Sequence, residues 1–429
     1  QLATPQISPA SVQAAASSTC GDELGARFTK LLCRWRAKTN KSGLPPSSSE
    51  EPFTSAQMSS LFFQALNPDP SVQAELTIAL AGSYDGSVTA TDLLQYVGLA
   101  TSVYCSLPRV SVATTVKAER FSGDDGGGAR VAYAWLHDLL FDGASCKQTA
   151  GKAVPSKSFN LEMLEKWLRG HSALFSVVQF TVVRSMVSAE LPMAPPLMPV
   201  LHLPKNVSPR VSCSEVLLLN TALPPLLRRE WRLLFSNTVH GDSFSLLMKQ
   251  IVNAGPTIVV VEDEDGNKFG GFASGAWEVR PQFHGTGESF LLSLRPESGV
   301  YRSTGYNSNY QYLNYLHNNT MPNGLGMGGR EELFGMFLSD DFGECQVAPS
   351  CTTFHSPQIC PNRSPKIRYL TIWGVGEEAK DSSDEEEDGA AKPKKRSALD
   401  TNADATAMLD MIGRVRASDG LREPDPESD

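Results

Sequence analysis

Apolar residues recur at helical spacing through much of the first half of the chain. Ser, Thr or Asn stands at plausible starts of these stretches, as helix caps commonly do. The pattern predicts helices over Thr54–Leu66, Ser71–Leu80, Thr91–Val103, Arg130–Leu140 and Asn160–Trp167. Residues 51–188 are therefore expected to form a helical region.

The segments on either side of this region have a different composition. Residues 1–50 are rich in Ala, Ser, Thr and Pro, and they predict a linker-like segment around one short helix near Asp22–Arg36. Residues 189–210 contain six prolines, which interrupt a continuous helix and suit an extended connector. We therefore expect a domain boundary at this Pro-rich connector.

Residues 211–376 change to short β-rich runs separated by Gly and Asn turns. Thr257–Glu262 and Lys268–Ala273 flank an acidic Gly-containing turn, which predicts a hairpin, and Phe244–Val252 predicts a helix capped by Asp242 and Ser243. Further strands are expected at Arg232–Phe235, Ser289–Leu294, Val300–Thr304, Gln311–Tyr315, Leu333–Leu338 and Tyr369–Val375. No parallel βαβ alternation is visible, so the pattern favours an antiparallel sandwich, and with the helical region the chain is expected to be α+β.

The last stretch alternates charged blocks with one apolar stripe. Residues 377–401 read as a charged flexible tether, residues 402–418 as an isolated amphipathic helix and residues 419–429 as an acidic tail. The apolar stripe of the helix consists of Met408, Met411, Ile412 and Val415. A helix this short is marginal alone, so its stripe is expected to cover either a groove on a partner or the body of this chain.

Two serines of the tether are candidates for modification. Ser382 and Ser383 have acids at their +3 positions, Glu385 and Glu386. An acidophilic kinase could therefore phosphorylate them, and each phosphate would add about −1.5 to −2 charges.

Composition and charge exclude several classes of protein. The chain has 429 residues and a net charge of −9. Residues 377–429 hold 16 acids and 8 bases, which leaves 31 acids and 30 bases in the rest of the chain. The body therefore offers no broad basic field for nucleic acid. Eight scattered cysteines without a C-x-x-C pattern disfavour a disulfide scaffold, and the most apolar stretch, Ala173–Val187, is too short to span a bilayer.

Two local motifs resemble ligand sites but lack the required context. Gly324, Gly326 and Gly329 satisfy G-x-G-x-x-G, yet no strand is predicted before them, so we interpret them as a tight structural loop. The segment around Asp85 resembles the centre of an EF-hand loop. Its first position would be Ala81 and its twelfth Asp92 in place of Glu, which predicts a calcium-silent, degenerate helical pair.

Two clusters could in principle carry metal or nucleophilic chemistry. Cys345, Cys351, His355 and Cys360 place four soft ligands in sixteen residues, but their intervals lack the paired spacing of structural zinc sites. His240, Asp242 and Ser243 lie close in sequence without a nucleophile elbow around the serine. We therefore expect no metal, no cofactor and no catalytic residues.

Seven ordered motifs give the second half a family resemblance. Residues 231–376 resemble a TLDc domain through Trp231-Arg-Leu-Leu-Phe-Ser, His240-Gly-Asp-Ser-Phe-Ser, Phe269-Gly-Gly-Phe-Ala-Ser, Gly285-Thr-Gly-Glu-Ser-Phe-Leu, Gly324-Leu-Gly-Met-Gly-Gly, Cys351-Thr-Thr-Phe and Ile372-Trp-Gly-Val-Gly. The helical region, the degenerate loop at Asp85 and the ending Gly420-Leu-Arg-Glu are similar to the mTOR-associated members of the family.

This resemblance implies both a fold and a function. The implied TLDc domain, residues 211–376, has a two-sheet core flanked by helices and follows an EF-hand-like region. The implied function is that of a non-enzymatic adaptor that binds subunits of the V-ATPase and the mTOR machinery, and we expect the chain to be monomeric. Its implied location is cytoplasmic and peripheral on the lysosomal membrane. The alternative is oxidation protection, and relatives also have more chain before the region of residues 52–66, which implies a truncated start.

Overall fold

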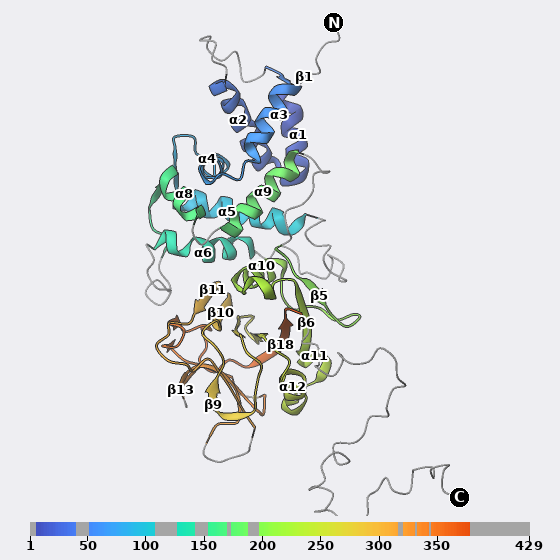
Figure 1. Cartoon of the computed structure of the whole chain (residues 1–429), viewed down its shortest axis with the longest axis vertical. Coiled ribbons are helices and arrows are strands. Elements are labelled where there is room, and N and C mark those ends of the chain that lie inside the picture. The colour runs from blue at the N-terminus through green and yellow to red at the C-terminus, as the bar shows by residue number, and fades with distance from the viewer. Residues whose placement is uncertain are drawn as a thin grey trace, which may run out of the picture. The chain divides into compact units, whose positions relative to one another are not determined.

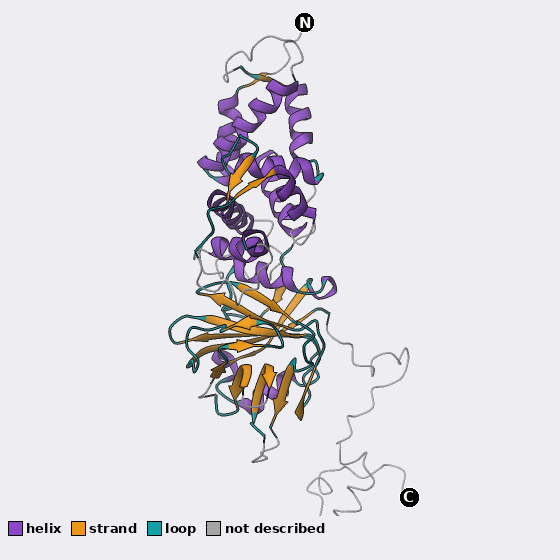
Figure 2. Cartoon of the chain, turned by 90° about the vertical axis from the view of Figure 1, so that its left-hand side faces the viewer, coloured by secondary structure: helices purple, strands orange, loops and turns teal. Residues whose placement is uncertain are grey.

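The computed structural model describes residues 6–39, 51–107, 127–141, 153–169, 173–187, 197–315, 321–330, 333–342 and 345–377. Helices dominate the first half of this part and strands dominate the second (Figures 1 and 2). The α+β class expected from the pattern is therefore confirmed. No helix among the described residues has the length and apolar character needed to cross a bilayer.

Among the described residues, the first half contains the five helices predicted within residues 51–188, the helix predicted near Asp22–Arg36 and two others. Its helices are α1 (Pro9–Cys20), α2 (Asp22–Thr39), α3 (Ser55–Ala65), α4 (Pro70–Leu80), α5 (Ala90–Ser106), α6 (Gly127–Leu140), α8 (Leu161–Arg169) and α9 (Ala173–Val187). Four short strands accompany them: β1 (Gln6–Ile7), β2 (Phe53–Thr54), β3 (Ser87–Thr89) and β4 (Ser158–Asn160).

The linker-like interpretation of residues 1–50 is wrong for α1, whereas α2 corresponds to the helix expected near Asp22–Arg36. Helix α1 is rich in Ala and begins with Pro at its first turn after the Ser8 cap, and α2 buries Leu24, Phe28 and Trp35. The Ala and Ser residues that suggested a linker allow close packing of α1 on α2: a Cβ at Gly25 would lie 2.7 Å from the backbone N of Ser17. Small residues here make a tight helix contact.

The segment around Asp85 belongs to one of two helix–loop–helix units that pair through short strands. The unit formed by α4 and α5 has β3 in its loop, the unit that ends in α8 has β4, and the two strands pair antiparallel with Val88 opposite Phe159. Thr89 caps α5 by accepting a hydrogen bond from the backbone N–H of Asp92. The EF-hand-like description of this region stays a prediction.

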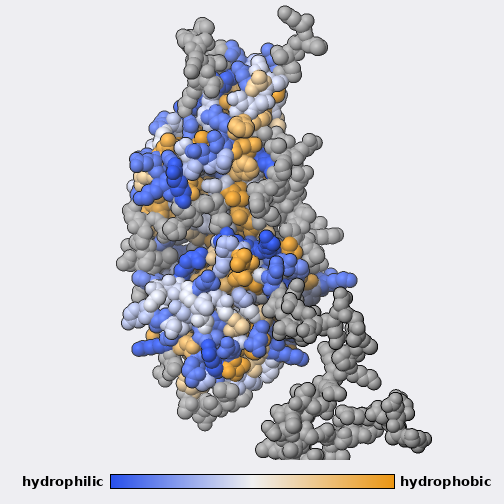
Figure 3. Space-filling model, viewed as in Figure 1, coloured by the Kyte–Doolittle hydropathy of each residue, from blue (hydrophilic) through white to orange (hydrophobic). Residues whose placement is uncertain are grey.

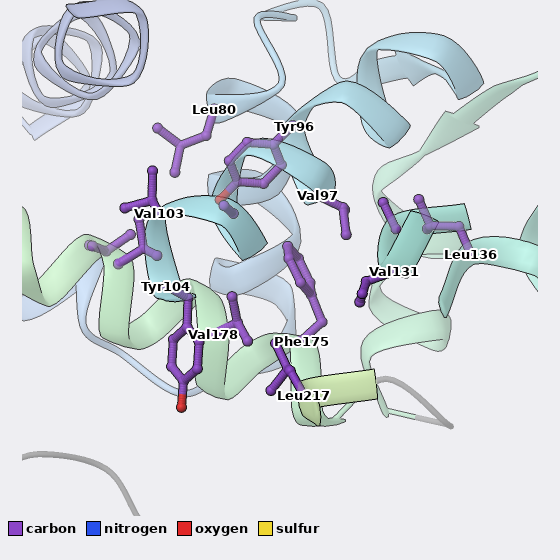
Figure 4. Packing of buried hydrophobic residues seen from close by; sticks show 14 of the residues in the cluster. Leu80, Tyr96, Val97, Val103, Tyr104, Val131, Leu136, Phe175, Val178 and Leu217 are labelled. Carbon is purple, nitrogen blue, oxygen red and sulfur yellow. The ribbon is translucent and has the colours of Figure 1, made fainter. Parts of the chain in front are cut away.

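A buried polar network holds the centre of the helical half together. The Gln179 amide of α9 accepts from Thr77 and Tyr96, both at 2.8 Å, and donates to the Gln73 side chain at 2.8 Å. Both ends of this buried amide are satisfied, so the network fixes the register of α4, α5 and α9. Around it Phe175 packs among α5, α6 and α10 side chains (Figure 4).

The second half contains two large sheets and three helices with a short 3₁₀ turn. The seven-stranded sheet has the order β11-β10-β8-β7-β18-β6-β5 and the five-stranded sheet the order β15-β14-β13-β12-β9. The strands are β5 (Val200–His202), β6 (Glu230–Ser236), β7 (Thr257–Asp263), β8 (Lys268–Ala273), β9 (Arg280–His284), β10 (Phe290–Arg295), β11 (Gly299–Arg302), β12 (Gln311–Asn314), β13 (Gly324–Arg330), β14 (Leu333–Ser339), β15 (Cys345–Val347), β16 (Ser350–Cys351), β17 (Ser356–Pro357) and β18 (Ile367–Val375). The other elements are α10 (Cys213–Ala222), η3 (Pro225–Leu227), α11 (Asn237–His240) and α12 (Phe244–Ile251).

The continuous apolar run of β7 follows from burial on both faces of its sheet. Val259 and Val261 belong to the core that β12, β13 and β14 of the second sheet also line, whereas Ile258 and Val260 belong to the core shared with α10 and the helical half. Strands covered on both faces read as unbroken hydrophobic sequence rather than as alternation. The seven-stranded sheet is therefore the middle layer of the fold.

One expectation about the strands is wrong, and another has an exception. The Gly324–Gly329 segment is strand β13, paired on both sides with β12 and β14, and not a loop. The two large sheets are antiparallel as expected, except that the edge strand β5 pairs with β6 in parallel through the α10 crossover. The Pro-rich connector thus supplies the edge strand β5. The residues of this strand include no proline, so each of them has a backbone N–H.

Helix α10 joins the two halves of the compact unit formed by residues 1–379. Its Asn220 side chain accepts from the Trp231 indole of β6 and donates to the Leu197 carbonyl of the connector. On its other side, Leu217 packs in the same core as the helices α5, α6 and α9 (Figure 4). The helical half and one face of the seven-stranded sheet therefore share one continuous core, and a second core lies between the two sheets.

Candidate functional site

The glycine-rich strand β13 gives no cradle for a phosphate. A Cβ at Gly324 would lie 2.2 Å from the Leu338 carbonyl oxygen, and one at Gly326 would lie 2.5 Å from the Phe334 ring. The space next to these glycines is filled by β14, so no ligand can approach there. Gly328 and Gly329 have φ of 68° and 84°, which only glycine adopts without strain. These glycines serve the packing of the sheet.

The Cys–His cluster is a set of separate thiols in a hydrophobic core. Cys345, Cys351 and Cys360 are buried in the core between the two sheets, and His355 lies exposed in a turn. Burial raises the pKa of the Cys345 and Cys351 thiols and raises that of Cys360 to about 12. Within the described residues, no group of His, Cys, Asp or Glu side chains is arranged to hold a metal ion.

The His240, Asp242 and Ser243 side chains are occupied by local structure. The His240 Nδ1 lies 3.1 Å from the Ser236 backbone N–H, and the Asp242 carboxylate accepts from Asn237. The Ser243 hydroxyl accepts from the Leu246 backbone N–H and thereby caps α12, as predicted. The structure does not assemble these three groups into a nucleophile and its base.

The residues expected in the tail lie outside the described residues. These are Ser382, Ser383, Met408, Met411, Ile412 and Val415. Their roles stay predictions.

Sequence reasoning missed a buried cluster of charges at the start of α10. Glu215 accepts a hydrogen bond from the Arg295 Nε at 2.8 Å, and its other carboxylate oxygen lies 3.2 Å from the Lys268 ammonium. Lys268 also lies 3.4 Å from Glu262 and donates to the Arg210 carbonyl. The side chains of Glu215 and Lys268 are 3% and 5% exposed, so this is an ion pair of the domain interior.

The cluster also defines the beginning of the helix. Glu215 accepts from the Ser212 backbone N–H at 2.7 Å while the Ser212 hydroxyl accepts from the Glu215 backbone N–H, which forms a capping box. The Ser212-x-x-Glu215 spacing was the available signal in the sequence. This cluster therefore links the first turn of α10 to β8 and β10 of the sheet.

The visible face in Figure 3 is mixed in character. Hydrophobic residues gather in a narrow band over the helical half, while hydrophilic residues predominate over most of the second half. Elsewhere, single large apolar side chains are strongly exposed, among them Phe63 of α3, Leu226 of η3 and Tyr306 of the β11–β12 loop. The arrangement provides contact surfaces and, within the described residues, none of the catalytic geometries considered above.

Comparison with known proteins agrees with this description. The family model for the TLDc domain matches residues 211–376. The chain is 37% identical over 311 residues to the Danio rerio MTOR-associated protein MEAK7, and this match covers 69% of the chain and 67% of the relative. It is 45% identical over 217 residues to the Gallus gallus protein of that name, with 50% and 44% covered.

A more distant relative shares the second half. The Homo sapiens nuclear receptor coactivator 7 is 28% identical over 178 residues, which cover 39% of this chain and 18% of the relative. The chain spans somewhat less than half the length of the chicken and mouse relatives that it matches. The extent of the zebrafish match, together with the TLDc domain, shows that the chain belongs to the family of TLDc proteins that includes the MTOR-associated protein MEAK7.

Proposed function

We propose that the chain is a non-enzymatic adaptor that binds the V-ATPase and supports mTOR signalling at the lysosomal surface. The observation that carries this proposal is the similarity to relatives named for association with MTOR, over both the helical half and the TLDc domain. V-ATPase binding follows from the family resemblance of the TLDc motifs. The protein acts as a monomer that brings its partners together, without a cofactor or nucleic acid.

The architecture suits an adaptor because the buried polar networks described above stabilise the fold. In the helical half, the buried side chains of Gln73, Thr77 and Tyr96 are paired through Gln179. In the TLDc domain, Lys268 and Arg295 are paired through Glu215. These paired groups hold the elements of the fold in register. Among the described residues, the exposed surface is therefore the part that we propose binds the partners.

Oxidation protection is the competing function, and the thiols argue against its direct form. A thiol peroxidase needs an accessible thiolate of low pKa. Burial instead raises the pKa of Cys20, Cys33, Cys345, Cys351 and Cys360. These five thiols therefore disfavour direct reduction of peroxide.

Affinity capture from detergent-solubilised lysosomal membranes tests the proposal. The intact chain is expected to retain V-ATPase subunits and components of the mTOR machinery, and a chain ending at Gly376 should retain less of both. A peroxide-consumption assay on the same preparations separates the two functions. Turnover of peroxide together with no capture of the pump by the intact chain would contradict the adaptor proposal.

A further inference from the structure

A cavity of about 340 Å³ lies in the helical half, away from the TLDc domain. Its walls come from α2, α4, the loop that follows α4 and the first residue of α8. This volume is at the lower end of the range of ligand pockets and is enough for bulky apolar side chains. No residue of this cavity takes part in the networks described above.

The floor of the cavity is apolar and contains one hydrogen-bond donor without an acceptor. Leu31, Trp35 and Ile78 are at most 4% exposed, and Leu161 at the edge is 39% exposed. The buried Trp35 indole N–H has no hydrogen-bond partner among the described residues. The floor thus favours an apolar group.

Two cations lie beside the cavity: Arg34, which lines it, and Lys30, which contacts the ring of the lining residue Tyr84. The carboxylate among the lining residues, Glu75, is already engaged in an interaction of its own. Lys30 and Arg34 are exposed and lie one turn apart on α2, with their charged groups 4.3 Å and 4.6 Å from the centre of the Tyr84 ring. No carboxylate of the described residues forms an ion pair with either of them, in contrast to Arg27, which pairs with Glu23. Two like charges over one ring repel each other, and anionic groups placed beside them would relieve that repulsion.

We propose that this cavity binds an acidic helical segment of a partner protein, with a bulky apolar side chain on the floor and carboxylates on Lys30 and Arg34. The spacing of the two cations selects this occupant, because carboxylates one turn apart on a helix match cations one turn apart on α2. A free small acid would neutralise one cation and leave the other. The site is separate from the tail helix and from the TLDc domain, so it adds a further attachment point to the proposed adaptor, and this inference rests on that proposed function.

Fluorescence anisotropy with designed peptides and the full chain tests this proposal. The probe is a labelled 16-residue helical peptide with Leu and Phe on one face and flanking glutamates. One matched peptide replaces the glutamates by lysines, and another replaces Leu and Phe by alanine. The variant protein carries Lys30→Glu and Arg34→Glu. The control carries Lys205→Glu and Lys249→Glu, exposed lysines outside the cavity lining with the same change in charge.

The acidic peptide is expected to bind the wild type and the control equally and to bind the cavity variant at least tenfold more weakly. Both matched peptides should bind at least tenfold more weakly to the wild type. Ser83→Trp, which fills the cavity from its loop, should weaken the acidic peptide as well, with its melting temperature as the check on folding. Because Lys30 and Arg34 are exposed, their reversal decides the test even if Ser83→Trp unfolds.

Three outcomes would overturn the proposal. The acidic peptide could fail to bind, it could bind the cavity variant as tightly as the wild type, or its alanine form could bind equally well. If hexanoate alone changes the Trp fluorescence while no peptide binds, the occupant is a small apolar acid and not a helix.

Discussion

Glu215 is the residue on which the buried charges of the TLDc domain converge. It caps α10, forms an ion pair with Lys268 and accepts a hydrogen bond from Arg295, all within the domain interior. Burying charges costs free energy that the pairing offsets only when every partner is present. Removing one partner therefore leaves an uncompensated charge, and this makes the cluster sensitive to a single substitution.

Glu215→Gln should destabilise the protein by about 3 kcal/mol, because Lys268 and Arg295 lose their shared carboxylate while the amide can still accept from Ser212. Thermal unfolding of the full chain measures this as a lowered melting temperature. The matched control is Glu278→Gln in an exposed ion pair with Arg280, which should cost about 1 kcal/mol or less. Equal shifts for the two variants would show that the buried cluster adds nothing.

Cys360 should be unreactive in the native protein. With its pKa raised by burial to about 12, roughly 10⁻⁵ to 10⁻⁴ of the thiol is ionised near pH 7.5. Iodoacetamide labelling followed by mass spectrometry should show native Cys360 labelled far more slowly than Cys360 of the chain in urea. Labelling at the same rate in both states would show that Cys360 is reactive in the native protein and would support direct reduction of peroxide by this thiol.

The raised pKa of Cys360 also predicts how stability depends on pH. Below pH 9, the ordinary value for a thiol, the folded and unfolded states both keep the proton and this group has no effect on the pH dependence. Between about pH 9 and 12 only the folded state keeps it, so the unfolding free energy should fall as the pH rises. Cys360→Ala should remove this part of the alkaline decline.

At the scale of elements, strand β13 shows where pattern reasoning succeeds and where it stops. The helices α3, α4, α5, α6 and α8 and the hairpin of β7 and β8 could be predicted because their periodicity is local. Strand β13 could not be predicted, because its glycines show no apolar periodicity. Their role is to allow the close approach of β14, which is visible only in the folded structure. The helix α1 was missed for a related reason, since its small residues signal packing only when α2 is known to lie beside it.

Gly329→Ala should destabilise the sheet by roughly 1–3 kcal/mol. Its φ of 84° is strained for alanine, and the added Cβ would lie 2.2 Å from the Leu333 carbonyl oxygen. The control is Gly275→Ala, where the nearest atom would be 3.7 Å away. Melting temperatures of the two variants measure the difference, and a Gly329 variant as stable as the Gly275 variant would contradict the packing account of β13.

The loop between α4 and α5 should show no micromolar calcium affinity. Asp85 lacks the companion carboxylates of a functional EF-hand loop, and the described residues around it form no group suited to a metal ion. Isothermal titration calorimetry of the full chain should give no saturable heat. A saturable micromolar signal that Asp85→Ala abolishes would show that the loop is a working calcium site.

At the scale of the whole molecule, the halves on either side of the Pro-rich connector are joined by α10. The sequence predicted a domain boundary at residues 189–210, but β5 from this segment pairs with β6 and Leu197 bonds to Asn220. These contacts are non-local and leave no periodic signal. The family motifs located the TLDc domain, whereas the charged cluster at Glu215 and the cavity beside Trp35 depend on tertiary contacts.

The central claim is that the protein is an adaptor whose expected tail helix is a second attachment to the V-ATPase. A tethered helix would act intramolecularly after the first contact, so even a weak site could raise avidity by one or more orders of magnitude. Met411→Asp together with Ile412→Asp would place two charges in that contact. The opposing interpretation is that the helix covers the body of this chain.

Equilibrium binding of the purified V-ATPase to the immobilised full chain, with melting temperature recorded in parallel, is the most direct test. The adaptor account predicts tight binding by the full chain, at least tenfold weaker binding by the Met411→Asp, Ile412→Asp variant, and the same melting temperature for both. Unchanged binding with a lowered melting temperature would place the helix on the chain's own body, and no binding by the full chain would contradict the account as a whole.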